Sequence, residues 1–200
     1  CPENENTNRE LSLKSLTDYV AALESEGYKI DHDRIYTSGM SMGGMASMYC
    51  AVKGADIVAA STAQGCAGKG LIFGEASEFD SYLTPKDFQS GKIAPMYFLV
   101  GDHEMAYQIP LTDEALEGLN TWLKASGCGE AKRADNILGF TADKLYEMEI
   151  DGTTYTFAEF YNQAGEKTVV FVGIEDWVHW TPYSYARLSW QFMSQFTNKK

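Results

Sequence analysis

Residues 34–47, RIYTSGMSMGGMAS, decide how the rest of the chain is interpreted. They run from a short β-forming segment through the pattern GMSMG at 39–43 into a stretch of small and apolar residues. This order predicts a strand over 34–38, a sharp turn at Ser41 and a helix over 42–52. A G-x-S-x-G nucleophile elbow requires that same strand–turn–helix context, so the segment predicts a reactive serine. The alternative is a Gly- and Met-rich bend that matches the pattern by chance.

The predicted turn would support chemistry at the Ser41 hydroxyl. Gly39 and Gly43 give room for a strained turn and for a close contact between strand and helix. The hydroxyl would stand at the amino end of the helix, where the helix dipole favours negative charge. The backbone N–H of Met42 would then be one donor to the oxyanion of an acyl-transfer intermediate.

Around this segment, buried strands alternate with helices. The patterns predict helices over 15–26, 112–126 and 182–196, strands over 55–61, 94–101 and 167–173, and a hairpin over 146–157 that turns at Asp151-Gly152. Strands that are apolar on both faces and separated by helices indicate an α/β fold with a parallel sheet. We expect one domain over 1–200, with an irregular polar lead-in over 1–14.

Composition limits the partners of the chain. The formal net charge of -12 and the pI near 4.6 oppose binding to nucleic acid or to anionic membrane surfaces, so neutral ligands are expected. No apolar run approaches the roughly 20 residues that span a bilayer. The chain starts at Cys1 rather than Met, which indicates either a removed signal or a piece of something larger. Cys1, Cys50, Cys66 and Cys128 could form disulfides in an exported protein or remain free thiols.

A nucleophilic serine needs a base, and the chain has three histidines. His32 precedes the strand that leads to the elbow and is expected in a surface loop. His103 follows the strand over 94–101, whereas His179 lies between the last predicted strand and the last predicted helix. In α/β-hydrolases the order is serine, acid, histidine, with the histidine after the last strand, so His179 fits and His103 does not. The acid that orients this imidazole would be Asp102 or Glu104.

Three segments resemble a group of secreted α/β-hydrolase esterases that includes polyhydroxybutyrate depolymerases and feruloyl (cinnamoyl) esterases. IDHDRIYTSGMSMGGMAS (30–47) is similar to their I-D-P-x-R-V-Y-x-x-G-x-S-x-G-G segment. VHWTP (178–182) resembles their G-H-x-W-P segment and places the base at His179. PMYFLVGDHE (95–104) resembles their P-x-x-x-x-H-G-x-x-D segment, in which Glu104 falls on the acidic position and is therefore preferred to Asp102.

The resemblance implies an α/β-hydrolase fold and a serine carboxylesterase that works through an acyl-serine intermediate, without a metal or organic cofactor. The expected substrate is a feruloyl or acetyl ester of plant cell-wall polysaccharide, with a polyhydroxyalkanoate as the alternative. Trp177, Trp180 and Tyr107 lie near the predicted site and would either stack on the substrate or belong to the core. An extracytoplasmic location is expected.

The resemblance also exposes a gap. Such enzymes have several strands before the elbow, and one of the loops there gives the second oxyanion donor. Residues 1–14 are too few to supply them, so we expect an N-terminally truncated fold, with turnover lowered ~10²–10³-fold for a lost donor. The sheet edge left open would invite pairing with another copy of the chain. Two alternatives to the esterase are a non-catalytic carbohydrate-binding relic of the fold and a peptidase of the same fold.

Overall fold

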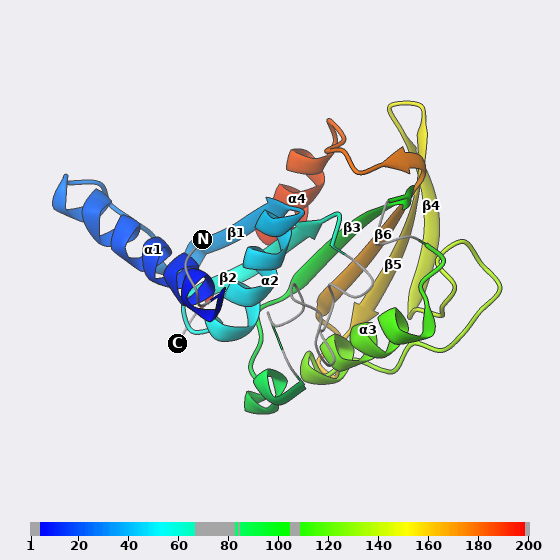
Figure 1. The fold of residues 1–200 in the computed structure, drawn as a ribbon, viewed down its shortest axis with the longest axis horizontal. Helices are drawn as coiled ribbons and strands as arrows, with labels where there is room; N and C mark the ends of the chain where they lie inside the picture. Colours follow the sequence, from blue (N-terminus) through cyan, green and yellow to red (C-terminus); the bar gives the residue numbers. More distant parts are fainter. Residues whose placement is uncertain (1–4, 67–82, 84, 105–108, 199–200) are drawn as a thin grey trace.

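One mixed sheet organises the chain (Figure 1). The computed structural model describes residues 5–66, 83, 85–104 and 109–198. Within these residues the sheet has six strands in the order β1-β2-β3-β6-β5-β4. β1, β2, β3 and β6 are parallel to one another, and β5 and β4 continue the sheet in antiparallel fashion. The predicted α/β class, with a mostly parallel sheet flanked by helices, is confirmed.

The predicted helices and strands follow one another in the expected order, with shifted ends, and two short 3-10 helices that were not predicted lie between them. They are α1 (Glu5–Ser25), the short 3-10 helix η1 (His32–Arg34), β1 (Ile35–Met40), α2 (Met42–Lys53), β2 (Val58–Gln64), the 3-10 helix η3 (Pro85–Ser90), β3 (Met96–His103), α3 (Asp113–Ala125), β4 (Lys144–Ile150), β5 (Thr153–Tyr161), β6 (Lys167–Val178) and α4 (Tyr185–Met193). None of the helices in the described ranges is long and apolar enough to cross a membrane.

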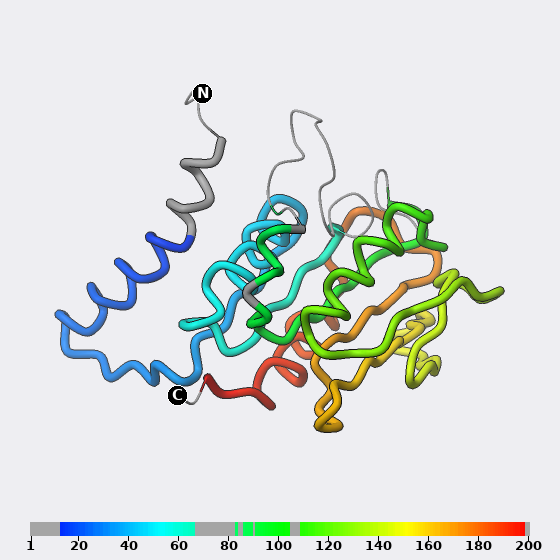
Figure 2. Tube along the Cα trace, turned by 90° about the horizontal axis from the view of Figure 1, so that it is seen from below, coloured from blue at the N-terminus to red at the C-terminus, as the bar shows by residue number. Residues whose placement is uncertain are grey.

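Helices cover both faces of the sheet. Side chains of α2 and α3 share one buried apolar cluster with one face of the strands, and α4 packs into a second cluster on the opposite face. Figure 2 shows the sheet between these two layers, with α1 to one side of the body. All seven residues of β2 are buried, because the strand is covered on both faces. The buried central strands therefore fix the positions of the residues that follow their ends.

The irregular lead-in expected over 1–14 is wrong from Glu5 onward, where α1 already begins. No glycine or proline interrupts residues 5–25, and Lys14 pairs with Asp18 one helical turn later. A polar composition alone therefore does not mark a segment as irregular when helix breakers are absent. Residues 1–4 lie outside the described part of the chain.

β6 is longer than the strand predicted over 167–173, because it continues to Val178 through a bulge. Its register against β3 shifts between Gly101 and His103, and Asp176 takes a left-handed conformation with φ 51°. A Cβ on Gly101 would lie 2.1 Å from the carbonyl oxygen of Trp177, so glycine is required where the bulge crosses β3. The polar residues of the bulge hide this part of the strand from a hydrophobicity pattern.

The hairpin predicted over 146–157 is confirmed and extends over 144–161. Asp151 and Gly152 form its turn with φ 53° and 79°, as a two-residue turn of this type requires. β5 pairs with β6, so the hairpin continues the main sheet and leaves β4 at its edge.

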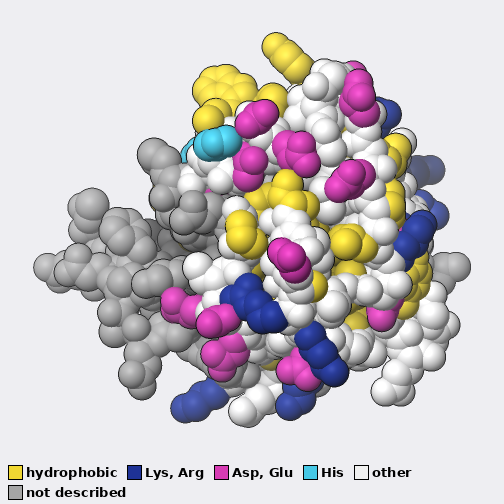
Figure 3. Space-filling model, turned by 90° about the vertical axis from the view of Figure 1, so that its right-hand side faces the viewer, with side chains coloured by type: hydrophobic (Ala, Val, Ile, Leu, Met, Phe, Trp, Pro, Cys, Tyr) yellow, Lys and Arg dark blue, Asp and Glu magenta, His cyan; other side chains and the backbone are white. Residues whose placement is uncertain are grey.

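The two edges of the sheet differ in composition. β4 carries Lys144, Glu147 and Glu149, and charges of both signs are mixed with hydrophobic side chains on that side of the molecule (Figure 3). Charged edge strands resist pairing with other chains. β1, at the other end of the described sheet, reads IYTSGM and has no charged residue. Pairing of β1 with another copy stays a prediction.

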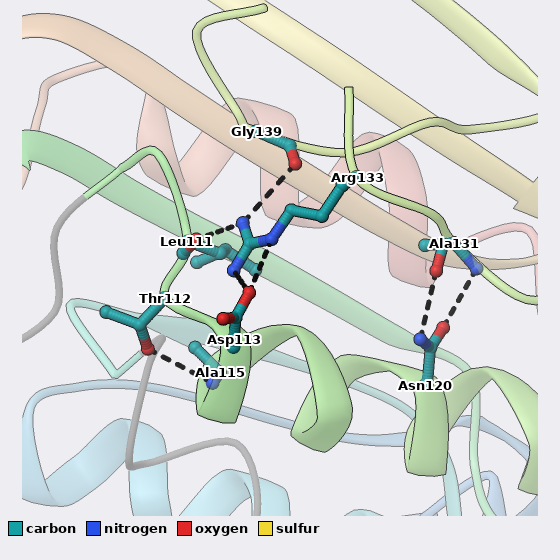
Figure 4. A network of polar contacts seen from close by, with 8 residues as sticks. All are labelled: Leu111, Thr112, Asp113, Ala115, Asn120, Ala131, Arg133 and Gly139. Atoms are coloured by element: carbon teal, nitrogen blue, oxygen red, sulfur yellow. Dashed lines mark hydrogen bonds and ion pairs between the residues drawn. The ribbon is translucent and has the colours of Figure 1, made fainter. Parts of the chain in front are cut away.

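A polar network fixes α3 and the segment that follows it (Figure 4). The Thr112 hydroxyl caps the first turn of the predicted helix by accepting a backbone N–H at 3.2 Å. Arg133 donates to Asp113 at 2.7 Å and also reaches two backbone carbonyls. Asn120 exchanges two hydrogen bonds with the backbone of Ala131, at 3.0 and 2.8 Å. The loop between α3 and β4 is thereby held against the helix.

Candidate active site

Four residues meet at the carboxyl ends of the parallel strands, because each directly follows one of these strands. Ser41 follows β1, Gly65 follows β2, Glu104 follows β3 and His179 follows β6. The carboxyl ends of parallel strands point the same way, and ligands of open α/β sheets bind outside those ends. Ser41, Glu104 and His179, which are far apart in sequence, are therefore brought to one place.

Ser41 occupies the sharp turn between β1 and α2. Its φ of 55° and ψ of -121° lie in a region that residues other than glycine rarely adopt. The Ser41 N–H donates to the Gln64 carbonyl at 2.8 Å, and the Ser41 carbonyl accepts from the Met45 N–H at 3.0 Å. Backbone strain of this kind persists only where surrounding structure enforces it, and it is characteristic of functional turns. The strand–turn–helix geometry predicted for this segment is present.

Close packing around the turn depends on two glycines. A Cβ on Gly39 would lie 2.3 Å from the backbone of Gly43, so the close strand–helix contact predicted for this pair exists. A Cβ on Gly43 itself would meet nothing within 4 Å, which corrects the expectation that both positions need glycine. Gly44 does need it, because its Cβ would lie 2.1 Å from the Sγ of Cys66.

His179 and Glu104 form a hydrogen-bonded pair. The Nδ1 atom of His179 contacts the Oε2 atom of Glu104, whose side chain is only 1% exposed. In a neutral imidazole this bond places the proton on Nδ1 and leaves Nε2 free to accept another. Gly65 makes room for the ring: its φ is +60°, and a Cβ there would lie 2.7 Å from the His179 Cε1 atom.

The Ser41 turn and the His179 ring contact successive residues of the chain. Ser41 is bonded to the carbonyl of Gln64, and the imidazole lies against Gly65. Within the described residues, no hydrogen bond joins the Ser41 hydroxyl to His179. Such bonds are often long in the absence of substrate and shorten when substrate binds.

Asp102 has a different set of partners. Its carboxylate accepts backbone N–H groups from Asp176 at 3.1 Å and from Trp177 at 3.0 Å, and contacts the Nδ1 atom of His103 at 2.9 Å. Burial alone would raise the pKa of Asp102, but these hydrogen bonds outweigh it and hold the pKa below its ordinary value. Asp102 thus stabilises the bulge of β6 and makes no hydrogen bond to His179.

The other two histidines are exposed. His32 lies in η1 and pairs with Glu24 at 2.6 Å, away from the carboxyl edge of the sheet. His103 ends β3 with its side chain 62% exposed. Asp102, His103 and Asp176 offer possible metal-ligand atoms within 4.8 Å of one another. The bonds that both Asp102 oxygens make to the backbone account for this cluster.

Met42 is the first residue of α2, and it is 71% exposed. The N–H groups of the first helical turn have no acceptor within the helix, so that of Met42 can bind an anionic oxygen next to Ser41. The geometry is compatible with the predicted oxyanion donor, and the role itself stays a prediction.

The aromatic residues expected near the site separate into two kinds. The Trp177 Nε1 atom donates to the carbonyl of Trp180 at 2.7 Å, and Gln64 Nε2 donates to the same carbonyl at 2.6 Å. The Trp177 ring packs against the core, whereas Trp180 is 69% exposed beside His179. Tyr107 lies outside the described residues.

Sequence patterns did not indicate a supporting network beneath the elbow. The hydroxyl of Tyr185, on α4, contacts Ser38 and Thr62 at 3.0 Å each and the carbonyl of Gly39 at 3.2 Å. Cys66 donates its thiol to the Ser41 carbonyl at 3.4 Å, and burial raises the pKa of that thiol. Cys50, Cys66 and Cys128 are free thiols, so the disulfide alternative does not hold for the described cysteines.

Comparisons with known proteins support the fold. No protein-family model matches the chain, and no curated protein matches it in sequence. Among solved structures, it is similar to the acetyl xylan esterase from Aspergillus awamori, with a TM-score of 0.55 and 13% identity, over 91% of this chain and 66% of that one. An S-formylglutathione hydrolase from Agrobacterium tumefaciens aligns with a TM-score of 0.44 and 13% identity, over 90% of this chain and 53% of that one. The sheet order and the similarity to the acetyl xylan esterase show that the chain has an α/β-hydrolase fold.

Proposed function

We propose that this chain is a serine carboxylesterase in which Ser41 is the nucleophile, His179 the general base and Glu104 the acid. The observation that carries the proposal is the juxtaposition of a serine in a strained turn with an imidazole that pairs with a buried carboxylate, both at the carboxyl end of the parallel strands. A surface serine or a structural histidine needs neither feature. The similarity in fold to an acetyl xylan esterase is consistent with this chemistry.

The geometry suggests how each group would act. Glu104 holds the Nδ1–H of His179, so Nε2 takes the proton of the Ser41 hydroxyl as its oxygen attacks the ester carbonyl. The Met42 N–H would stabilise the resulting oxyanion. The imidazolium then protonates the leaving alcohol, and water hydrolyses the acyl-serine by the same steps. Because Glu104 is buried, its charge stabilises the imidazolium more strongly than an exposed carboxylate would.

For the substrate we propose a neutral acetyl or feruloyl ester on plant cell-wall polysaccharide. The net charge of -12 disfavours anionic substrates. The exposed indole of Trp180 next to His179 offers a flat surface for an aromatic acyl group or a sugar ring. A polyhydroxyalkanoate ester is the alternative. This reaction would use no metal or organic cofactor, and we propose an extracytoplasmic location for it.

Hydrolysis of four esters tests this function: p-nitrophenyl acetate, acetylated xylan, methyl ferulate and a hydroxybutyrate oligomer. We expect the wild-type chain to hydrolyse p-nitrophenyl acetate and at least one of acetylated xylan and methyl ferulate. The Ser41→Ala variant should hydrolyse none of the four. Faster turnover of the hydroxybutyrate oligomer would instead favour the depolymerase alternative. Cleavage of peptides without cleavage of esters would contradict the esterase.

A second function has one observation in its favour. No hydrogen bond joins Ser41 to His179 in the described residues, as would be expected of a non-catalytic, carbohydrate-binding relic of the fold. A folded wild-type chain that binds xylan but hydrolyses none of the four esters would support this function over the esterase.

A further inference from the structure

His179 lies at the centre of a short turn that little packing holds in place. The Trp180 N–H donates to the Val178 carbonyl at 2.6 Å, and this bond between residues two positions apart forms a γ-turn with His179 in the middle. Val178 and Trp180 are 57% and 69% exposed, so burial of these two neighbours contributes little to the position of the turn. Hydrogen bonds to the rest of the fold therefore have a large share in deciding where the imidazole lies.

One buried side chain makes such a bond. Gln64, at the end of β2, is 1% exposed, and its Nε2 atom donates to the Trp180 carbonyl at 2.6 Å. The backbone carbonyl of Gln64 accepts the Ser41 N–H at 2.8 Å. A single residue of a fully buried strand thus bonds both the turn that carries the proposed nucleophile and the turn that carries the proposed base. Residues anchored to a strand are positioned more precisely than residues held only by a loop.

Two other side chains hold the same loop in different ways. Trp177 Nε1 donates to the Trp180 carbonyl at 2.7 Å, but Trp177 belongs to β6 and so links the turn only to its own strand. The Thr181 hydroxyl donates to Met40 Sδ at 2.9 Å, and a thioether sulfur is a weak acceptor. Of the described side chains that bond to the backbone of residues 178–180, Gln64 is the one that comes from another strand.

Stability does not account for an amide at this position. The Oε1 atom of Gln64 is buried and has no hydrogen-bond partner among the described residues, and a buried acceptor without a partner lowers stability. An apolar side chain of similar size would avoid that loss, and the Trp180 carbonyl would keep its bond from Trp177. A polar group that is retained at a cost to stability is expected where function requires it.

We propose that Gln64 is a positioning residue, which holds the turn at 178–180 so that the His179 imidazole faces the Ser41 hydroxyl when substrate binds. The inference rests on the proposed serine esterase function. Gln64 is buried and its Nε2 atom is bonded to Trp180, so it acts through His179 and does not touch the reacting atoms. Without this donor the γ-turn can shift, and a misplacement of about 1 Å can lower a rate roughly a hundredfold.

Gln64→Met tests the proposal, because it keeps the length of the side chain and removes the donor. We expect kcat for p-nitrophenyl acetate to fall roughly ten- to a hundredfold, with KM changed less than about threefold. Tm should stay within about 3 °C of the wild-type value, since one bond is lost and one unpaired acceptor is removed. Gln64→Leu, a second variant without the donor, should behave in the same way.

Gln195→Met is the matched control. Gln195 also donates from its Nε2 atom to a backbone carbonyl, but it is exposed and lies just after α4. The same substitution there should leave kcat unchanged.

Two further measurements show whether Gln64 acts through His179. In the His179→Ala background, Gln64→Met should change the residual rate by less than about twofold, because the imidazole that it positions is gone. In NMR spectra of the chain with 15N-labelled imidazoles, exchange of the His179 Nδ1–H with water should become roughly three- to tenfold faster in Gln64→Met, as for one lost hydrogen bond. The resonance is assigned by its absence from His179→Ala.

Three results would overturn the role of Gln64: Nδ1–H exchange and, for an active wild type, kcat that both variants leave unchanged; an equal loss of rate with and without His179; or lost activity with Tm lowered by more than about 6 °C in both variants, which would mean that the amide stabilises the fold. The NMR measurement needs no turnover. A wild-type chain that hydrolyses no ester would contradict the proposed function, whereas unchanged exchange would contradict the role of Gln64, so the two failures are distinguishable.

Discussion

Two histidine–carboxylate pairs lie at the carboxyl ends of the parallel strands and differ in how deeply they are buried. His103 and Asp102 contact each other at 2.9 Å, with side chains 62% and 23% exposed. His179 and Glu104 form the same kind of contact with side chains 27% and 1% exposed. Only the second pair lies against Gly65, next to the residue that binds the Ser41 backbone.

The difference shows that residue type alone does not identify a charge pair of the kind that general base catalysis needs. Both oxygens of Asp102 are engaged by the backbone of the β6 bulge, so this carboxylate stabilises the fold. Glu104 is directed at the imidazole, and burial removes the solvent screening that weakens exposed pairs. Substitutions at the two pairs should therefore affect activity and stability differently.

Removing each imidazole should separate the pairs most clearly. His179→Ala should lower kcat/KM for p-nitrophenyl acetate roughly 10³–10⁶-fold, because the serine loses its base. His103→Ala should change kcat/KM by less than about threefold, since its exposed ring pairs with Asp102 and not with Ser41 or Glu104. Similar losses in the two variants would abolish the distinction between the pairs.

Removing each carboxylate charge should have effects of different kinds. Glu104→Gln should lower kcat roughly 10²–10⁴-fold, because the imidazole loses the group that orients it and stabilises its charge. Asp102→Asn should lower the free energy of unfolding by about 1–2 kcal/mol, with a much smaller effect on kcat. Steady-state kinetics and urea unfolding of both variants measure this. A catalytic loss confined to Asp102→Asn would reverse the assignment of the acid.

Gly65 tests whether the position of the His179 ring matters. Gly65→Ala should lower kcat roughly tenfold to a hundredfold, because the new Cβ would lie 2.7 Å from the His179 Cε1 atom. Gly91→Ala is the matched control: its φ of +68° imposes similar backbone strain, but its Cβ would meet nothing within 4 Å. Equal activity of the two variants at equal stability would mean that the imidazole does not need this position.

The smallest effect concerns stability at acid pH. The pKa of Asp102 is held below its ordinary value of 3.8 in the folded chain. Its stabilisation is therefore complete above that pH and is lost as the pH falls through the lower, folded pKa. Wild type should lose more stability than Asp102→Asn in that window, as followed by urea unfolding at several pH values. Parallel curves would mean that Asp102 is not held in its charged form by the bulge.

The part of the site that is local in sequence could be predicted. The strand, the turn at Ser41 and the helix lie within residues 34–53, and the periodicity and glycines of that segment specify them. The position of His179 after the last parallel strand followed from the order of elements. The α/β class followed from strands such as the one predicted over 94–101, which is apolar on both faces.

The remainder depends on contacts that no local pattern encodes. The resemblance favoured Glu104 over Asp102 as the partner of His179, but the physical reason lies in the bulge of β6, whose backbone engages both Asp102 oxygens. The contact between Tyr185 and the Gly39 carbonyl joins residues 146 positions apart. No sequence motif identifies Gly65, because it is needed only to leave room for the His179 ring that packs against it.

The most direct test of the central claim is labelling of the chain with a fluorophosphonate probe, with the modified residue identified by mass spectrometry. A serine activated by His179 and Glu104 should be labelled at Ser41, and labelling should disappear in Ser41→Ala and collapse in His179→Ala, while His103→Ala is labelled like wild type. A folded wild-type chain that takes up no label, or one labelled equally well without His179, would contradict the assignment of Ser41, His179 and Glu104 as a working catalytic group.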